Sequence, residues 1–199
     1  MTVYLYTGTP GSGKSLHLAK LLYWDLKLDR PVIANFDVNT KHNKSFYKVE
    51  NEKLTPDYLV AFANEYFRTQ EFKEGSIQLY IDESQVIFGN RDWRNADRAG
   101  WIRFFTQHRK FGYNVFLVAQ HHEMIDKQIR ALVEYEVMHR KLNNVGLLGN
   151  VVNLVTFGHP VVCAVTRWYG MRMKLSSEWL VGTKNTYSLY DTRKIFNAS

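Results

Sequence analysis

A glycine-rich stretch at residues 8–15 constrains the fold more than any other part of the sequence. It matches G-x-x-x-x-G-K-[ST] and begins one residue after the apolar run Val3–Tyr6. In such a loop the backbone surrounds phosphates, the lysine reaches the β- and γ-phosphates, and the final hydroxyl contacts Mg²⁺. The alternative is a turn that only caps an ordinary helix. Because an apolar strand precedes the motif and a helical pattern follows it, we predict a nucleotide-binding loop that comprises Gly8, Thr9, Pro10, Gly11, Ser12, Gly13, Lys14 and Ser15.

Leucines at helical spacing follow this loop and predict an amphipathic helix from Lys14 to about Leu28. The N-terminus of that helix would direct its N–H groups and its positive dipole end toward the phosphates. The apolar run 32–36 is expected to form a short buried strand. The polar run 37–53 is interpreted as a surface loop, and its basic and aromatic side chains leave contact with nucleic acid open as an alternative.

Two carboxylates follow the next apolar run, Ile77–Ile81. An apolar strand that ends in an acidic residue, downstream of a phosphate loop, is how nucleotidases of this class hold magnesium. We therefore predict that Asp82 binds Mg²⁺ together with the Ser15 hydroxyl, and that Glu83 polarises the water that attacks the γ-phosphate. The alternative is that both carboxylates only start the next helix.

A further apolar run, 115–119, is expected to be a buried strand that ends at Gln120. A polar side chain at this position can contact the attacking water or the γ-phosphate, so Gln120 is a candidate sensor of the nucleotide. His121 and His122 come next, but adjacent histidines point in different directions and the sequence shows no third ligand. We therefore do not predict a metal site there.

Cations and aromatic side chains alternate between residues 91 and 111. Trp101, Phe104, Phe105 and His108 share one face of a helix, whereas Arg103, Gln107 and Lys110 share another. Two interpretations stay open. Either the aromatic face packs on the core and the basic face is solvated, or the basic face meets the nucleotide of another subunit or a polyanion.

The last third of the chain has a β-type pattern. Strands are expected at 135–140, 150–157, 161–169 and 187–190, with glycines between them. Strands that alternate with helices, followed by a run of strands, predict an α/β fold with a parallel sheet and a C-terminal antiparallel β addition. We expect a single domain over residues 1–199, with the strand-rich extension at about 146–199.

Composition limits the cellular setting. The net charge of +7 favours an acidic partner such as nucleic acid, a membrane surface or a nucleotide-rich site, and charge alone does not choose among these. Cys163 has no second cysteine to pair with, so a reducing cytoplasm is the simplest setting. Met1 leads almost directly into the first expected strand, so we expect no cleavable signal peptide. The chain contains no apolar run long enough to span a membrane.

These motifs resemble a known family. The order of the phosphate loop, the Asp82-Glu83 strand and the Gln120 strand is similar to RecA-like P-loop NTPases that have an extra strand between the Walker A and Walker B motifs. A narrower set, spread over essentially the whole chain, resembles the zonula occludens toxin (Zot) family. Beside residues 8–15, this set comprises Ile81-Asp82-Glu83, the run 108–112 before a strand that ends in Ala119-Gln120, Ile125-Asp126 and Arg130.

The resemblance implies the ATPase domain of the filamentous-phage assembly protein, a bacterial inner-membrane protein that powers extrusion of single-stranded phage DNA. It implies ATP and Mg²⁺ as cofactors, a homo-oligomeric ring, and phage assembly and coat proteins as partners. Family members continue into a transmembrane helix and a periplasmic tail, so this segment would be the cytoplasmic portion. The tight-junction activity attributed to one member's tail is not implied.

Motors of this class complete their site across a subunit boundary, and Arg109 and Arg130 are our candidates for that arginine. Two other functions remain open. A small-molecule kinase would use the same phosphate loop with an acceptor pocket. A non-catalytic DNA-binding or scaffolding protein with a vestigial loop would fit the basic charge, although it would leave Glu83 and Gln120 without a role.

Overall fold

The computed structural model describes residues 1–39, 44–89, 95–143, 154–157 and 159–182. Its strands are β1 (Val3–Thr7), β2 (Val32–Ala34), β3 (Phe46–Lys48), β4 (Ile77–Ile81), β5 (Tyr113–Val118), β6 (Tyr135–Lys141), β7 (Val161–Trp168) and β8 (Met173–Val181). They form one sheet in the order β3-β2-β4-β5-β1-β6-β7-β8. The pairs from β3 to β6 are parallel, and β7 and β8 are added by antiparallel pairing. The predicted α/β class with an antiparallel addition is confirmed.

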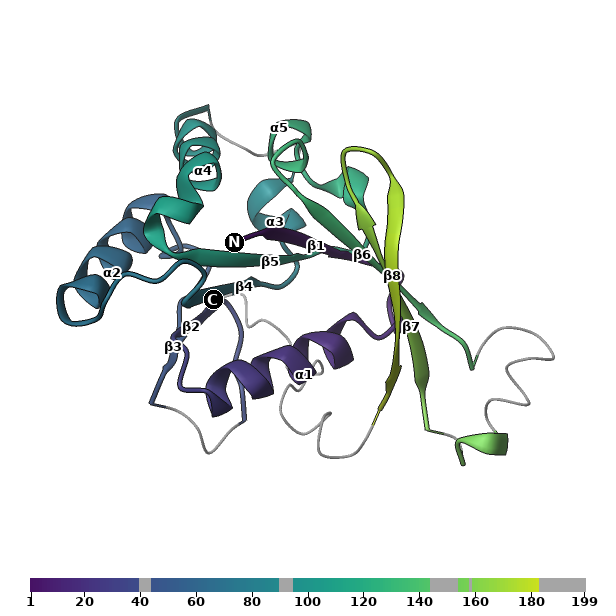
Figure 1. Cartoon of the computed structure of the whole chain (residues 1–199). Helices are drawn as coiled ribbons and strands as arrows, with labels where there is room; N and C mark the ends of the chain where they lie inside the picture. The colour runs from purple at the N-terminus through teal and green to yellow at the C-terminus, as the bar shows by residue number, and fades with distance from the viewer. Residues whose placement is uncertain (40–43, 90–94, 144–153, 158, 183–199) are drawn as a thin grey trace.

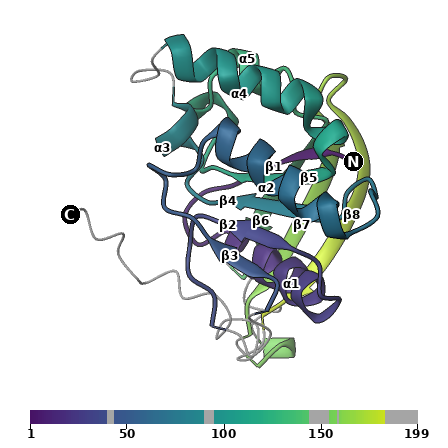
Figure 2. The same ribbon diagram turned by 90° about the vertical axis from the view of Figure 1, so that its left-hand side faces the viewer.

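The helices lie in two layers, one on each face of this sheet (Figures 1 and 2). They are α1 (Lys14–Lys27), α2 (Pro56–Thr69), α3 (Gln85–Phe88), α4 (Asn95–Gln107) and α5 (Lys127–Arg130), with 3-10 turns at His108–Phe111 and His122–Met124. Among the described helices, α1 covers one face by itself, and the other four cover the opposite face. The predicted first helix, from Lys14 to about Leu28, is therefore confirmed to within one residue.

Strand β1 shows how the sequence builds these two layers. Successive side chains of a strand point to opposite faces, so Val3 and Leu5 enter the cluster with α2 and α4, whereas Tyr6 enters the cluster with α1. All three are at most 3% exposed. A strand buried on both faces reads as a continuous apolar run, and this is the pattern that predicts β1, β4 and β5.

The aromatic stripe between residues 101 and 108 faces the core. Trp101, Phe104, Phe105 and His108 are buried, whereas Arg103 and Lys110 are exposed. The aromatic face therefore packs on the core, and both interpretations of the exposed basic face stay predictions. The cations and the tryptophan at 91, 93 and 94 lie outside the described residues.

Three predictions about the strands need correction. The segment 37–53 is not wholly loop, because Phe46–Lys48 pairs with β2 as an edge strand. The expected strand 150–157 is wrong at its described end, where residues 154–157 form a helical turn that leaves Leu154, Val155 and Phe157 largely exposed. Its other half, and the strand expected at 187–190, lie outside the described residues. Strand β8 was not predicted, because most of its side chains are exposed and its longest apolar run is the three residues Trp179–Val181.

Within the described part of the chain, no helix combines the length and apolar composition needed to cross a membrane.

Candidate nucleotide site

The loop between β1 and α1 lies where the parallel strands end, the edge at which open α/β sheets bind ligands. Gly8 N–H donates to the carbonyl of Gln120, just beyond β5, at 3.2 Å. Ser12 N–H donates to the Thr9 carbonyl at 3.0 Å and closes a turn within the loop. Pro10 has no N–H, so the backbone donors for phosphate come from the other residues of the loop.

Two glycines of the loop are required by close contacts as well as by backbone conformation. Gly8 has φ of 146°, and a Cβ there would lie 2.7 Å from the His139 carbonyl of β6. Gly13 has φ of 99°, and a Cβ there would lie 2.2 Å from Cγ2 of Val162 in β7. Only glycine avoids both problems. The loop therefore rests directly on β6 and β7.

Lys14 folds back over the loop that precedes it. Its Nζ donates to the carbonyl of Gly8 at 2.5 Å and to that of Thr9 at 3.3 Å. Burial lowers the pKa of Lys14, while attraction to the charges of Asp82 and Glu83 opposes that shift. Within the described residues, the buried hydroxyl of Ser12 has no hydrogen-bond partner, as expected of a group that would contact a phosphate oxygen. The loop thus holds a cation and a polar group ready for an anionic ligand.

Asp82 comes immediately after β4 and is fixed by the end of β2. Its backbone N–H donates to Oδ1 of Asn35 at 2.8 Å, and its carbonyl accepts from Nδ2 of Asn35 at 2.9 Å. The Glu83 N–H donates to Oδ1 of the Asp82 side chain at 2.9 Å. Sequence reasoning missed Asn35, although a polar residue at the tip of a buried strand was the available signal.

Glu83 has a left-handed backbone, with φ of 46°. This conformation costs a non-glycine residue about 1–2 kcal/mol, and such residues cluster at functional sites. The neighbouring Ser84 holds the turn, because its N–H and its hydroxyl both donate to the Val118 carbonyl of β5 at 2.8 Å. The Glu83 carboxylate accepts a hydrogen bond from the Gln85 side chain. Hydrogen bonds between the turn that follows β4 and the end of β5 therefore position Glu83.

Ser15 and Asp82 have the chemistry that Mg²⁺ requires. Both offer oxygen donors, which this hard cation prefers. Ser15 is the second residue of α1 and adjoins Lys14, whose ammonium is attracted by Asp82 and Glu83. These residues therefore fit a magnesium ion held between the loop and the end of β4.

The remaining predicted residues are not all at the loop. Gln120 is half-buried and adjoins Gly8 through its carbonyl, and β5 lies between β1 and β4. Arg109 pairs with Glu134 at 2.9 Å, where β5 and β6 begin, which is the opposite edge of the sheet. Arg130 lies in α5, and its Nε is buried without a partner among the described residues. The fold thus brings Gln120 to this chain's own loop and leaves Arg109 away from it.

A buried pair of histidines supports the loop from the side of β6. His139 Nδ1 lies 3.1 Å from the Thr7 carbonyl, and His139 Nε2 lies 2.9 Å from His17 Nδ1. Because a carbonyl only accepts, His139 donates from Nδ1 and accepts at Nε2 from His17. Burial lowers the pKa of His17 to about 4 and that of His139 to about 3. Both rings are therefore neutral near pH 7.

A second contact ties the end of β1 to β6. The Thr7 hydroxyl donates to Oε1 of Glu136 at 2.9 Å, and His122 Nδ1 lies 3.7 Å from the same oxygen. His17 Nε2 in turn faces Oε2 of Glu178, in β8, at 3.7 Å. Sequence reasoning missed these contacts, because no motif marks single polar residues on β6 or β8.

Comparison with known proteins places this geometry in a family. The family model described as Zonular occludens toxin (Zot) matches residues 2–190. The chain belongs to the Zot family. Its relatives include the Gene 1 protein of Enterobacteria phage fd, 28% identical over 215 residues, and that of Salmonella phage IKe, 25% identical over 214 residues. The chain matches these proteins over its full length but spans only 61% and 58% of theirs.

Solved structures share the fold of this Zot domain. The N-terminal domain of zonular occludens toxin from Neisseria meningitidis aligns with a TM-score of 0.54 at 19% identity, over 96% of this chain and 98% of that one. The genome packaging NTPase B204 of Sulfolobus turreted icosahedral virus 2, in complex with ATP-gammaS, aligns with a TM-score of 0.53 at 12% identity, over 89% and 96%. The P-loop NTPase fold is therefore confirmed.

Proposed function

We propose that this chain is the Mg²⁺-dependent ATPase domain of a filamentous-phage assembly protein, which couples ATP hydrolysis to extrusion of the virion. The observation that carries the ATPase is the position of Lys14, whose Nζ rests on the loop carbonyls while Asp82 and Glu83 attract its charge. The attraction between Lys14 and these carboxylates supports a single site built from separate parts of the sequence. The Gene 1 proteins of phages among its relatives support a role in the phage.

Each residue of the site has a proposed role in phosphoryl transfer to water. Lys14 exchanges its contacts with the Gly8 and Thr9 carbonyls for oxygens of the β- and γ-phosphates and offsets their charge. Glu83 accepts a proton from the attacking water, and the hydrogen bond from Gln85 orients its carboxylate. Gln120 contacts the water or the γ-phosphate and reports the state of the nucleotide to β5.

The Ser15 hydroxyl and the Asp82 carboxylate would hold Mg²⁺. When bound, the ion would neutralise part of the negative charge of the phosphates. Asn35 fixes the backbone of Asp82 on both sides, so the carboxylate is positioned before any ligand arrives. The site therefore needs little rearrangement to accept the ion together with the nucleotide.

The whole protein is proposed to act as a homo-oligomeric ring at the bacterial inner membrane, with this domain in the cytoplasm. Arg109 and Arg130 are the candidates to complete a neighbouring subunit's site, and Arg109 suits this role because it lies far from its own loop. Phage assembly and coat proteins, and single-stranded DNA, are the proposed partners. The membrane anchor would lie in sequence beyond this domain, since the named relatives are longer.

A steady-state ATPase assay over a range of protein concentrations, with and without single-stranded DNA, tests this function. We expect phosphate release that requires Mg²⁺ and rises more steeply than the protein concentration, because subunits share sites. Lys14→Ala should lower turnover by about 10³-fold or more, since it removes the charge that stabilises the transition state. The matched control is Lys73→Ala, which removes an exposed cation just before β4, at the edge of the sheet opposite the loop.

Other results would contradict the proposal. Wild-type turnover by Lys14→Ala would show that the loop is not the catalytic site. Phosphate transfer that depends on an added small-molecule acceptor would indicate a kinase. DNA binding without nucleotide dependence and without hydrolysis would indicate a scaffolding protein with a vestigial loop.

A further inference from the structure

The loop has a second neighbour besides the carboxylates. A Cβ at Gly13 would lie 2.2 Å from Val162, so the loop is seated on β7. Val162 pairs with Leu180 of β8, and β8 ends one residue later. Strand β8 runs parallel to β1, because two antiparallel pairings separate it from β6, and therefore ends at the same edge of the sheet as the loop. The end of β8 thus adjoins the first turn of α1.

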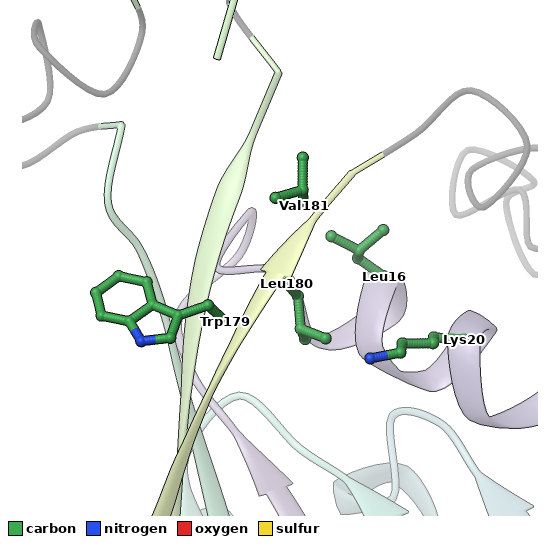
Figure 3. Close-up of a pocket in the computed structure, with 5 residues that line it drawn as sticks. All are labelled: Leu16, Lys20, Trp179, Leu180 and Val181. Carbon is green, nitrogen blue, oxygen red and sulfur yellow. The ribbon is translucent and has the colours of Figure 1, made fainter. Parts of the chain in front are cut away.

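A pocket opens between these two elements, as Figure 3 shows. Leu16 and Lys20 of α1 line one wall, and the last residues of β8, Trp179, Leu180 and Val181, line the other. Leu180 lies between the strand and the helix, near Leu16, whereas the indole of Trp179 lies on the opposite side of β8. Because Leu16 directly follows Ser15, the pocket begins one residue beyond the phosphate loop.

The pocket combines apolar walls with a charged rim. Leu16 and Leu180 are at most 3% exposed, and Val181, at 53%, extends the apolar surface to the solvent. On the rim, Lys20 Nζ pairs with Oε1 of Glu178 at 2.6 Å, and both side chains remain nearly half exposed. Small-molecule sites are typically apolar with a few polar groups that fix orientation. A nucleobase has apolar faces, and the adjoining ribose carries hydroxyls that a carboxylate or an ammonium can bind.

We propose that this pocket binds the base and ribose of the nucleotide whose phosphates lie on the Gly8–Ser15 loop. This inference rests on the proposed ATPase function. It assigns a binding site to the base and ribose, for which the sequence motifs give none. The phosphate chain ends at the carboxylates on one side of the loop, and the base occupies the opposite side. The base lies against the exposed Val181, with Leu16 and Leu180 at the floor of the pocket, and the Lys20–Glu178 pair contacts the ribose.

The test compares the affinities of ATP and of inorganic tripolyphosphate, which has the phosphates without base or ribose. Lys20→Trp places a large ring at the mouth of the pocket, at a position whose side chain is 46% exposed and tolerates substitution. We expect ATP binding to weaken at least tenfold, whereas tripolyphosphate binding changes less than twofold. The control is Lys27→Trp, which makes the same change at an exposed position two turns along α1 and should alter neither affinity.

Two results would overturn the base site. In one, ATP affinity is unchanged in Lys20→Trp; in the other, the ATP and tripolyphosphate affinities fall together. Photolabelling of the wild-type protein with 8-azido-ATP gives a second measurement that does not depend on a variant. Label on the peptides that carry Leu16–Lys20 or Trp179–Val181 supports the site, and label elsewhere contradicts it. Failure of the ATPase proposal is distinct, because a wild-type protein that binds ATP but does not hydrolyse it would overturn the ATPase and leave the base site to be judged by the affinities and the labelling.

Discussion

On one side of the phosphate loop, the ends of β2, β4 and β5 carry polar side chains bonded to one another and to backbone. On the other side, the buried His139 of β6 and Val162 of β7 lie directly behind the loop. Asn35 and Asp82 represent the first side, with two hydrogen bonds of 2.8 and 2.9 Å. Val162 and Gly13 represent the second, where no Cβ fits between them.

The polar side therefore supplies the reacting groups, and the apolar side supports the loop. The polar side presents groups whose charge can act on a phosphate or a water, and their positions depend on hydrogen bonds within and between strands. The apolar side supplies the surface on which the loop rests, and its precision comes from close packing. We therefore expect changes on the apolar side to alter stability and binding, and changes on the polar side to alter turnover.

Among the variants that test this difference between the two sides, Gly13→Ala should lose the most stability. A left-handed φ and an overlap with Val162 both oppose the added methyl group, and together they should lower the free energy of unfolding by about 2–4 kcal/mol. Gly11→Ala is the matched control, since Gly11 also has a positive φ but a Cβ there meets nothing within 4 Å. Its loss should be only about 1–2 kcal/mol. Urea unfolding measures both variants.

A double variant isolates the contact itself. If Val162 is the obstacle, Gly13→Ala combined with Val162→Ala should destabilise the protein by about 1 kcal/mol less than the sum of the single changes. Strict additivity, or equal losses for Gly13→Ala and Gly11→Ala, would show that β7 does not constrain the loop.

Asn35→Ala, a change on the polar side, should have an intermediate effect on stability and should also lower turnover. It removes both hydrogen bonds to the backbone of Asp82 and leaves buried groups unpaired, at a cost of about 2 kcal/mol. Because Asp82 then loses its position, the turnover number should fall about tenfold while ATP affinity changes little. Asn51→Ala serves as the control, since the Asn51 side chain bonds to the Asn35 side chain and its loss leaves both hydrogen bonds from Asn35 to Asp82 in place. Equal turnover in the two variants would remove Asn35 from the site.

The smallest effect concerns the histidine pair on the apolar side. Burial holds the pKa of His17 at about 4 and that of His139 at about 3, below the ordinary value of 6.5. The unfolded chain therefore binds protons more readily, and stability present above pH 6.5 is lost as the pH falls toward 4. Between pH 6.5 and 5.5 the loss should be about 1 kcal/mol for each histidine.

Urea unfolding at these two pH values, in wild type and in His139→Gln, checks this prediction. The glutamine variant is less stable at pH 6.5 but should lose less stability on acidification, because one titrating group is gone. An equal loss in both proteins would show that His139 is not held neutral by burial.

Sequence reasoning predicted the polar side of the site better than the apolar side. The spacing of Lys14, Asp82 and Gln120 reflects strands that end at one edge, and an apolar run followed by a polar residue is visible in a sequence. Asn35 ends a strand in the same way, but it belongs to no motif and was missed. The His17–His139 contact joins residues far apart in the chain, and only the pairing of β6 beside β1 brings them together.

The fold shows the same division. Strands β1, β4 and β5 are buried on both faces, so each is a nearly continuous apolar run that identifies it as a strand in the sequence. Strand β8 is an edge strand with polar and charged residues on much of its length, such as Lys174 and Glu178, and its composition resembles a loop. Residues 154–157 show the reverse error, since apolar side chains there remain exposed instead of joining the sheet. Partner strands, which a single sequence does not reveal, decide these cases.

The most direct test of the central claim is single-turnover phosphate release by Glu83→Gln. Glutamine keeps the size of the side chain and its contact with Gln85, but it cannot accept a proton from water. We predict that ATP affinity stays within twofold of wild type while the rate of γ-phosphate release falls by about 10²–10³-fold. A Glu83→Gln protein that releases phosphate within threefold of the wild-type rate would contradict the account.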